Sequence, residues 1–119
     1  MLFPEDISLN LPDSDIKYYP NFFNKEAADA YFNLLLKDIN WQQDDITIFG
    51  KTYKQPRLTA LFGNNGKPYS YSNITMYPED FSEELQQIKD KVETKVKAKF
   101  TTCLANLYRN GNDSNGWHA

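Results

Sequence analysis

The only histidine of the chain, His118, ends a segment whose other polar residues are spaced for ligand binding. Residues 100–108 alternate as in a β-strand, which puts Asn106 and Tyr108 on one face. A turn rich in Gly and Asn separates them from His118. An amide, a phenol and an imidazole grouped in this way predict one wall of a small-molecule or metal site. An ordinary hairpin with a surface histidine explains the same pattern, because one histidine is a weak signal for a metal.

A second group of chemically capable residues lies between Ile46 and Pro78, where the sequence contains no Asp or Glu. We call this stretch the acid-free window, since all 16 acidic residues lie outside it. Basic and aromatic side chains together are typical of a surface that binds a polyanion with splayed bases. Two hairpins that lack acids by chance explain the composition equally well. The cations are Lys51, Lys54, Arg57 and Lys67, and the rings are Phe49, Tyr53, Phe62, Tyr69, Tyr71 and Tyr77.

The composition excludes several classes of protein. A length of 119 residues predicts one domain or part of one, and 40% hydrophobic with 15% aromatic residues predicts a globular chain. A net charge of -3 argues against a simple basic nucleic-acid module. The single cysteine, Cys103, permits no disulfide within the chain, which is typical of a reducing compartment. We see no secretory signal or membrane-spanning run and expect an intracellular protein, in the cytoplasm or, in a eukaryote, the nucleus.

The elements that must position these residues are two helices and several short strands. Apolar residues at helical spacing predict helices over about 25–38 and 82–97, and Asn24 is expected to cap the first. Residues 1–15 are polar and contain prolines, which predicts a flexible arm. The fold class is therefore α+β, with two helices packed on antiparallel strands. Strand-like runs bounded by Gly, Pro and Asn cover residues 7–11, 16–23, 46–53, 57–62, 69–76 and 100–108.

Five short motifs follow one another at specific spacing: QPRLTALFG at 55–63, PYSYS at 68–72, ITM at 74–76, NLYRNG at 106–111 and WH at 117–118. Together they resemble the AlkB family of Fe(II)- and 2-oxoglutarate-dependent nucleic-acid demethylases. The resemblance is closest to the eukaryotic-type branch that repairs alkylated DNA or RNA. It covers roughly residues 16–119 and rests on the order of the motifs rather than on any one of them.

The resemblance implies a role for each candidate residue. His118 matches the first iron ligand of a His-x-Asp…His triad, and Asn106 and Tyr108 match the pair that hydrogen-bonds 2-oxoglutarate. Other matches lie on the substrate side, where aromatic and basic groups hold a flipped base and its phosphates. An apolar finger there fills the gap that the flipped base leaves. The substrate-side residues are Arg57, Tyr69, Tyr71, Ser72 and, as the finger, Phe49.

The resemblance further implies a double-stranded β-helix (jelly-roll) dioxygenase fold. The family's Asp, expected directly after Ala119, its distal His, its co-substrate arginines and its later strands are not among these residues. We therefore expect residues 16–119 to be the N-terminal part of the domain, with a nucleotide-recognition lid at about 46–78 and an incomplete C-terminus. Such a fragment would be inactive and expose unpaired strand edges.

The complete domain is expected to be a monomer that oxidatively demethylates N-alkylated bases in DNA or RNA as a repair enzyme. It would use Fe(II) and O2, with 2-oxoglutarate as co-substrate. Two rivals remain. One is a non-catalytic nucleic-acid-binding fragment built on the acid-free window, and the other is a structural β-domain without a ligand.

Overall fold

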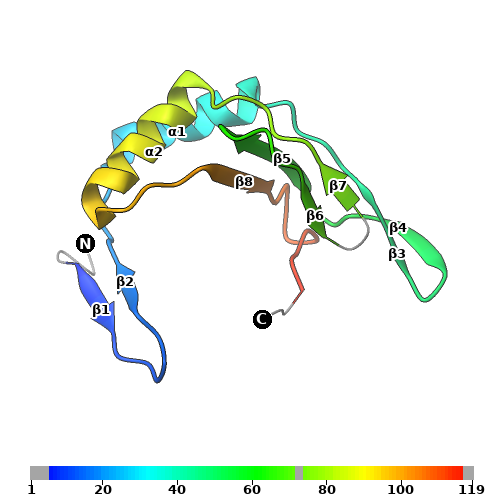
Figure 1. Cartoon of the computed structure of the whole chain (residues 1–119), viewed down its shortest axis with the longest axis horizontal. Helices are drawn as coiled ribbons and strands as arrows, with labels where there is room; N and C mark the ends of the chain where they lie inside the picture. Colours follow the sequence, from blue (N-terminus) through cyan, green and yellow to red (C-terminus); the bar gives the residue numbers. More distant parts are fainter. Residues whose placement is uncertain (1–5, 72–73, 117–119) are drawn as a thin grey trace. The chain divides into compact units, whose positions relative to one another are not determined.

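The computed structural model describes residues 6–71 and 74–116 (Figure 1). The chain divides into two compact units, residues 1–37 and 38–119. The described residues form two helices and antiparallel strand pairs, which confirms the predicted α+β class. Neither described helix is long and apolar enough to cross a membrane.

The first unit begins with a short antiparallel hairpin. Strand β1 (Ile7–Leu9) pairs with β2 (Ile16–Tyr18), so that Ile7 lies opposite Tyr18. The strand predicted within residues 7–11 and the extended segment predicted after residue 15 are both confirmed.

Helix α1 (Lys25–Asp38) follows the hairpin and has the predicted limits. Asn24 caps it, because the backbone N–H of Ala27 donates to Asn24 Oδ1 at 2.8 Å. Only one narrow stripe of the helix is half-buried, and Tyr31 on that stripe packs edge-on against Phe23 at 5.4 Å between ring centroids. Local aromatic contacts therefore stabilise this helix.

The second unit is organised around strand β5 (Leu58–Gly63), which pairs antiparallel with β8 (Thr102–Leu107). Thr59 lies opposite Asn106 in this pair. The other edge of β5 is also bonded, since Thr59 exchanges two backbone hydrogen bonds with Gln42, at 2.8 and 2.9 Å. Almost all of β5 is buried, whereas β8 alternates between half-buried and exposed residues. Strand β8, which runs into the NLYRNG motif, thus has one exposed face.

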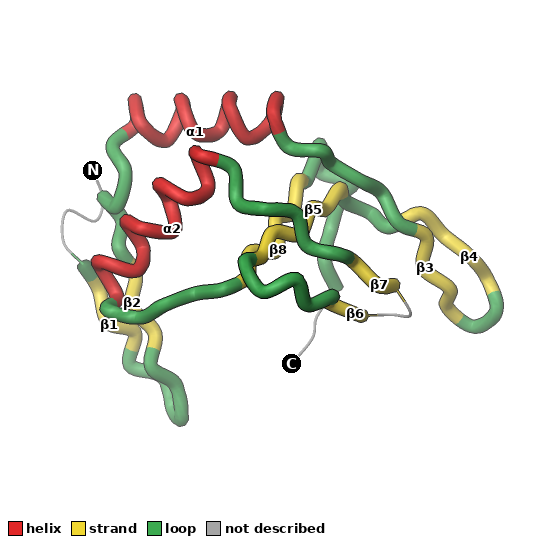
Figure 2. The backbone as a smooth tube through the Cα atoms, turned by 45° about the horizontal axis from the view of Figure 1, so that its top comes forward, coloured by secondary structure: helices red, strands yellow, loops and turns green. Residues whose placement is uncertain are grey.

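Two hairpins belong to the same unit (Figures 1 and 2). The first joins β3 (Asp45–Ile48) to β4 (Lys51–Lys54), so the strand-like run predicted over residues 46–53 is a hairpin. The second joins β6 (Tyr69–Tyr71) to β7 (Ile74–Met76), so the prediction of one continuous strand over residues 69–76 was wrong. The direction of the chain reverses between Tyr71 and Ile74, and the reversal puts Ile74 and Met76 in the core. These two residues pack with Leu61, and Ile46 lies against them.

Helix α2 (Glu83–Val96) lies within the predicted limits, is capped by Ser82, and ends at Lys97 in the left-handed conformation. Glu93 in its last turns is only 6% exposed and pairs with Lys89 at 3.2 Å. It also accepts the backbone N–H of Phe100 at 2.7 Å, and this bond is the main reason why its pKa lies below the usual value. Glu93 therefore fixes the approach of the chain to β8.

Candidate functional site

Strand β8 presents the two residues expected to bind a co-substrate. Asn106 is exposed, and Tyr108, one residue beyond the end of β8, is also exposed. The intervening Leu107 is half-buried, as is Cys103, whose thiol has a pKa raised by burial. The alternation predicted from the sequence is confirmed, and it turns an amide and a phenol to one exposed face.

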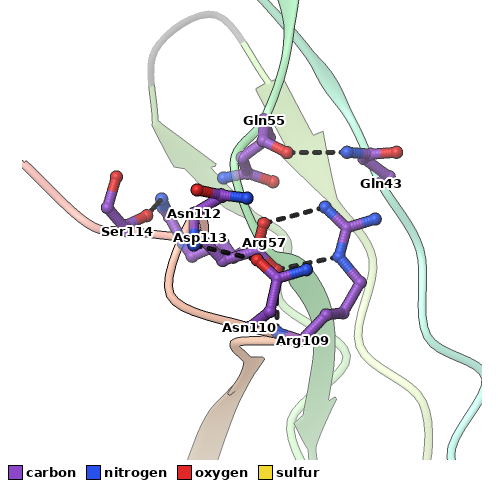
Figure 3. Close-up of polar contacts among 8 residues, drawn as sticks. All are labelled: Gln43, Gln55, Arg57, Arg109, Asn110, Asn112, Asp113 and Ser114. Atoms are coloured by element: carbon purple, nitrogen blue, oxygen red, sulfur yellow. Dashed lines mark hydrogen bonds and ion pairs between the residues drawn. The ribbon is translucent and has the colours of Figure 1, made fainter.

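The loop after β8 is closed by an ion pair that the sequence interpretation missed. Arg109 and Asp113 pair in a bidentate way, through Nε to Oδ2 at 2.8 Å and Nη2 to Oδ1 at 3.0 Å (Figure 3). Asp113 Oδ2 also accepts the backbone N–H of Arg109 at 2.8 Å. The Asp113 side chain is only 6% exposed, and its bond from the Arg109 side chain is the first cause that lowers its pKa to about 2. The loop that leads toward His118 therefore has a defined shape up to residue 116.

Arg57 joins this loop to β8. Its Nε donates to Asn106 Oδ1 at 3.0 Å, and its Nη1 donates to the backbone oxygen of Ser114 at 3.3 Å (Figure 3 shows the Ser114 end). The backbone N–H of Ser114 in turn donates to the oxygen of Pro56 at 2.8 Å. We call this group the Arg57 corner; its members are Arg57, Asn106, Arg109, Asp113 and Ser114.

A buried glutamine holds the chain just before the Arg57 corner. Gln55 is 1% exposed, and its backbone N–H donates to Asp44 O at 2.7 Å. Its backbone oxygen accepts Gln43 Nε2 at 2.8 Å (Figure 3). These bonds fix Gln55 to the segment before β3, so that Arg57 enters β5 from a rigid position.

The β3–β4 hairpin presents its tip to solvent. Phe49 and Gly50 form the two-residue turn, with φ of 50° and 76°. Two positive φ values are typical of the tight turns that suit the twist of a hairpin, but a non-glycine residue is strained there. Phe49 is 102% exposed. A fully exposed ring on a strained backbone is an unusual feature, and no packing contact accounts for it.

The remaining substrate-side residues are only partly described. Tyr69 in β6 is 44% exposed, and the backbone of Tyr71 lies in the same strand. Ser72 and the Tyr71 side chain lie outside the described residues. Phe62, a ring of the acid-free window, is 3% exposed and lies 6.4 Å from Phe81, so it belongs to the core and cannot stack with a base.

His118 lies outside the described residues, so its predicted place in a metal site stays a prediction. Within residues 6–71 and 74–116, no three His, Cys, Asp or Glu side chains are grouped to hold a metal ion. Asp113, the acid nearest in sequence, has both oxygens engaged by Arg109. The described residues therefore do not by themselves fit a metal.

Comparison with known proteins defines the class. The family model described as the 2OG-Fe(II) oxygenase superfamily matches residues 15–119. The chain therefore belongs to this superfamily.

Individual relatives show which members of the superfamily the chain is similar to. The chain is similar to "Alpha-ketoglutarate-dependent dioxygenase alkB homolog 3" of Bos taurus, 40% identical over 106 residues, which cover 84% of this chain and 35% of the relative. The Homo sapiens protein of the same name is 38% identical over 107 residues, 89% of this chain and 37% of the relative. "DNA oxidative demethylase ALKBH2" of Homo sapiens is 31% identical over 103 residues, 84% of this chain and 40% of the relative. The resemblance to the AlkB family is confirmed, and the chain spans somewhat more than a third of the length of these relatives.

Proposed function

We propose that this chain is the N-terminal part of a dioxygenase that uses Fe(II) and 2-oxoglutarate to demethylate N-alkylated bases in DNA during alkylation repair. The observation that supports this proposal most strongly is the exposed Asn106, whose amide oxygen accepts a hydrogen bond from Arg57, with Tyr108 exposed two residues further on. The superfamily implies a jelly roll, and we assign β5 and β8 to it. The name of the relative DNA oxidative demethylase ALKBH2 points to DNA demethylation and hence to an intracellular protein.

The co-substrate side uses hydrogen-bond donors and positive charge. Asn106 Nδ2 and the Tyr108 hydroxyl donate to the carboxylate or keto oxygens of 2-oxoglutarate, which is a dianion. Hydrogen bonds to charged groups are stronger than neutral ones, and each contributes about 1.5–3 kcal/mol. Among the described residues, the hydrogen-bond acceptors of Arg57 are an amide and a carbonyl oxygen, so no carboxylate neutralises its charge.

His118 supplies one imidazole to the iron. A facial triad needs a second histidine and a carboxylate, and this chain has one histidine. Once held by a full triad, the iron with O2 and 2-oxoglutarate supplies the oxidising power that hydroxylates an N-alkyl carbon, after which the alkyl group leaves as an aldehyde. The 119 residues alone are therefore expected to release no succinate.

The substrate side uses the acid-free window. Phe49 enters the base stack, and we assign Tyr69, Tyr71 and Ser72 to the flipped base and its phosphates. The full exposure of Phe49 and the exposed Tyr69 support this assignment. Removal of a base from a duplex costs a few kcal/mol, and an inserted ring offsets part of that cost.

The test uses the full-length protein that contains these residues, expressed from its gene. It is supplied with Fe(II), 2-oxoglutarate and an N-methylated DNA strand. We expect succinate and formaldehyde in equal amounts and a demethylated base. His118→Ala should remove this turnover, whereas Lys25→Ala, on the exposed surface of α1, should not. The absence of turnover in the wild-type protein, with iron bound, would exclude the proposed function. A parallel assay with methylated RNA decides between the two substrates.

A non-catalytic nucleic-acid-binding function is the second candidate. It is favoured by the absence of acids over residues 46–78, together with exposed Lys51, Lys54 and Lys67. This function predicts salt-dependent binding of oligonucleotides that needs neither metal nor 2-oxoglutarate and disappears with Arg57→Ala and Tyr71→Ala. Binding of that kind without any turnover would select it.

A further inference from the structure

Arg57 is assigned to the substrate side by resemblance alone, yet its side chain lies elsewhere. Its Nε is 3.0 Å from Asn106 Oδ1. The strand register explains this contact. Thr59 lies opposite Asn106, and Arg57 precedes Thr59 by two residues, so it emerges on the same side of the chain and reaches Asn106 diagonally.

The contact decides how the Asn106 amide is turned. A guanidinium has only donors, so the amide atom that faces Arg57 must be the oxygen. The two N–H groups of Nδ2 then point away from Arg57. Among the described residues, no group accepts a hydrogen bond from them, and Asn106 is exposed.

Arg57 is itself held in place. Its Nη1 donates to the backbone oxygen of Ser114 at 3.3 Å, and Ser114 is bound back to Pro56 at 2.8 Å. The guanidinium therefore has one position relative to β8, and a planar fork held at two points restricts rotation better than a flexible ammonium does.

From this geometry we propose that Arg57 is a positioning residue for the co-substrate: it fixes the Asn106 amide so that Nδ2 presents its N–H groups to a carboxylate of 2-oxoglutarate. The inference rests on the proposed function and deepens it. An unfixed amide also samples the flipped orientation, in which its oxygen would face and repel the carboxylate. Arg57 removes that state before 2-oxoglutarate binds, and its unneutralised charge favours the same anion.

Steady-state kinetics of the full-length, iron-loaded protein distinguish this positioning role of Arg57 from a role in binding the nucleic-acid substrate. We expect Arg57→Lys, which keeps the charge and loses the fork, to raise the KM for 2-oxoglutarate about tenfold and to leave the KM for methylated DNA unchanged. Lys54→Ala, a matched loss of an exposed cation from the same window, should leave the KM for 2-oxoglutarate unchanged. A higher KM for DNA with an unchanged KM for 2-oxoglutarate would overturn the proposal in favour of the substrate-side role.

Asn106→Asp provides a second variant that keeps the contact. The carboxylate of the introduced aspartate pairs with Arg57, so the fold is retained. This carboxylate has no N–H to donate to 2-oxoglutarate. We expect unchanged thermal unfolding and a loss of 2-oxoglutarate affinity of about a hundredfold or more, measured by calorimetry without O2. Wild-type-like affinity in Asn106→Asp would contradict the proposed donor role of Nδ2.

Nuclear magnetic resonance gives a readout that does not depend on turnover. The side-chain ¹⁵N signals of Asn106 should shift in Arg57→Ala and then move further on addition of 2-oxoglutarate, whereas Lys54→Ala should leave them in place. Unchanged Asn106 signals in Arg57→Ala would overturn the proposal. If the wild-type protein binds no 2-oxoglutarate at all, the proposed function itself fails. If the wild type and both Arg57 variants bind it equally, only the positioning role fails.

Discussion

The Arg57 corner and the β3–β4 tip both contain exposed side chains, but they are built in opposite ways. In the corner, side chains from separate segments hold one another, as in the contacts of Arg57 to Asn106 and Ser114. At the tip, Phe49 is fully exposed on a backbone with positive φ. One region is arranged before any ligand arrives, and the other presents a ring that gains contacts only from a partner.

This difference is consistent with the two ligands of the proposed function. A small anion is bound best by donors whose positions are fixed in advance, because little entropy is then lost on binding. A long nucleic acid supplies its own surface, so a single projecting ring suffices.

Truncation of a core side chain of β5 should have the largest effect. Leu61→Ala leaves a cavity where Leu61 packs with Ile74 and Met76, and should lower the free energy of unfolding by about 2–5 kcal/mol. Ile48→Ala, an exposed position in the tip hairpin, should change it by less than about 0.5 kcal/mol. Urea titration measures both. Equal losses would mean that the tip is as much a part of the core as β5.

Asn106→Ala should weaken 2-oxoglutarate binding by about 10- to 100-fold, since it deletes a hydrogen bond to a charged group of about 1.5–3 kcal/mol. The affinity for methylated DNA should stay within a factor of about two, because Asn106 is not on the tip. Anaerobic calorimetry measures the first and fluorescence anisotropy the second. Thr102→Ala, another exposed position of β8, is the matched control.

Phe49→Gly should act in two directions. Glycine adopts positive φ without strain, so the free energy of unfolding should rise by up to about 1 kcal/mol. The lost ring should reduce affinity for methylated DNA by about tenfold, which corresponds to a stacking contribution of about 1–3 kcal/mol. Phe49→Tyr keeps a ring and should retain the affinity. A stable Phe49→Gly protein with wild-type DNA affinity would remove the tip from the substrate side.

The smallest effect concerns pH. The pKa of Asp113 is about 2 in the folded protein and near 4 when unfolded, so its stabilising contribution is complete above about pH 4 and is lost as the pH falls toward 2. Asp113→Asn should therefore reduce the decline in stability between pH 4 and 2. Thermal unfolding across that range measures this decline. Asp29→Asn, on an exposed pair of α1, is the control. Parallel curves for wild type and Asp113→Asn would show that the ion pair adds nothing to stability.

Periodicity and turn chemistry predicted much of this structure. Both helices, the Asn24 cap of the first and the alternation of β8 followed from the spacing of apolar residues and from Gly, Asn and Ser at element ends. The reversal between β6 and β7 was missed because YSYSNITM alternates like a single strand. The burial of Phe62 was missed because composition does not say which face of a strand is covered.

The site was predictable only as far as local pattern extends. Asn106 lies in β8 and Tyr108 directly follows its last residue, so their shared face could be derived from alternation. The bond from Arg57 to Asn106 joins residues 49 positions apart and depends on the register of β5 with β8, which no local pattern contains. The Arg109–Asp113 pair had a signal that was overlooked, namely opposite charges four residues apart across an Asn-Gly turn.

One set of titrations tests the claim that the Arg57 corner binds 2-oxoglutarate and the β3–β4 tip binds nucleic acid. It uses wild type, Asn106→Ala, Phe49→Ala and the double variant, each titrated with 2-oxoglutarate and with methylated duplex DNA. We expect each substitution to weaken only its own ligand, with effects in the double variant that add to within about 0.5 kcal/mol. A loss of DNA affinity in Asn106→Ala with 2-oxoglutarate binding intact would contradict the claim.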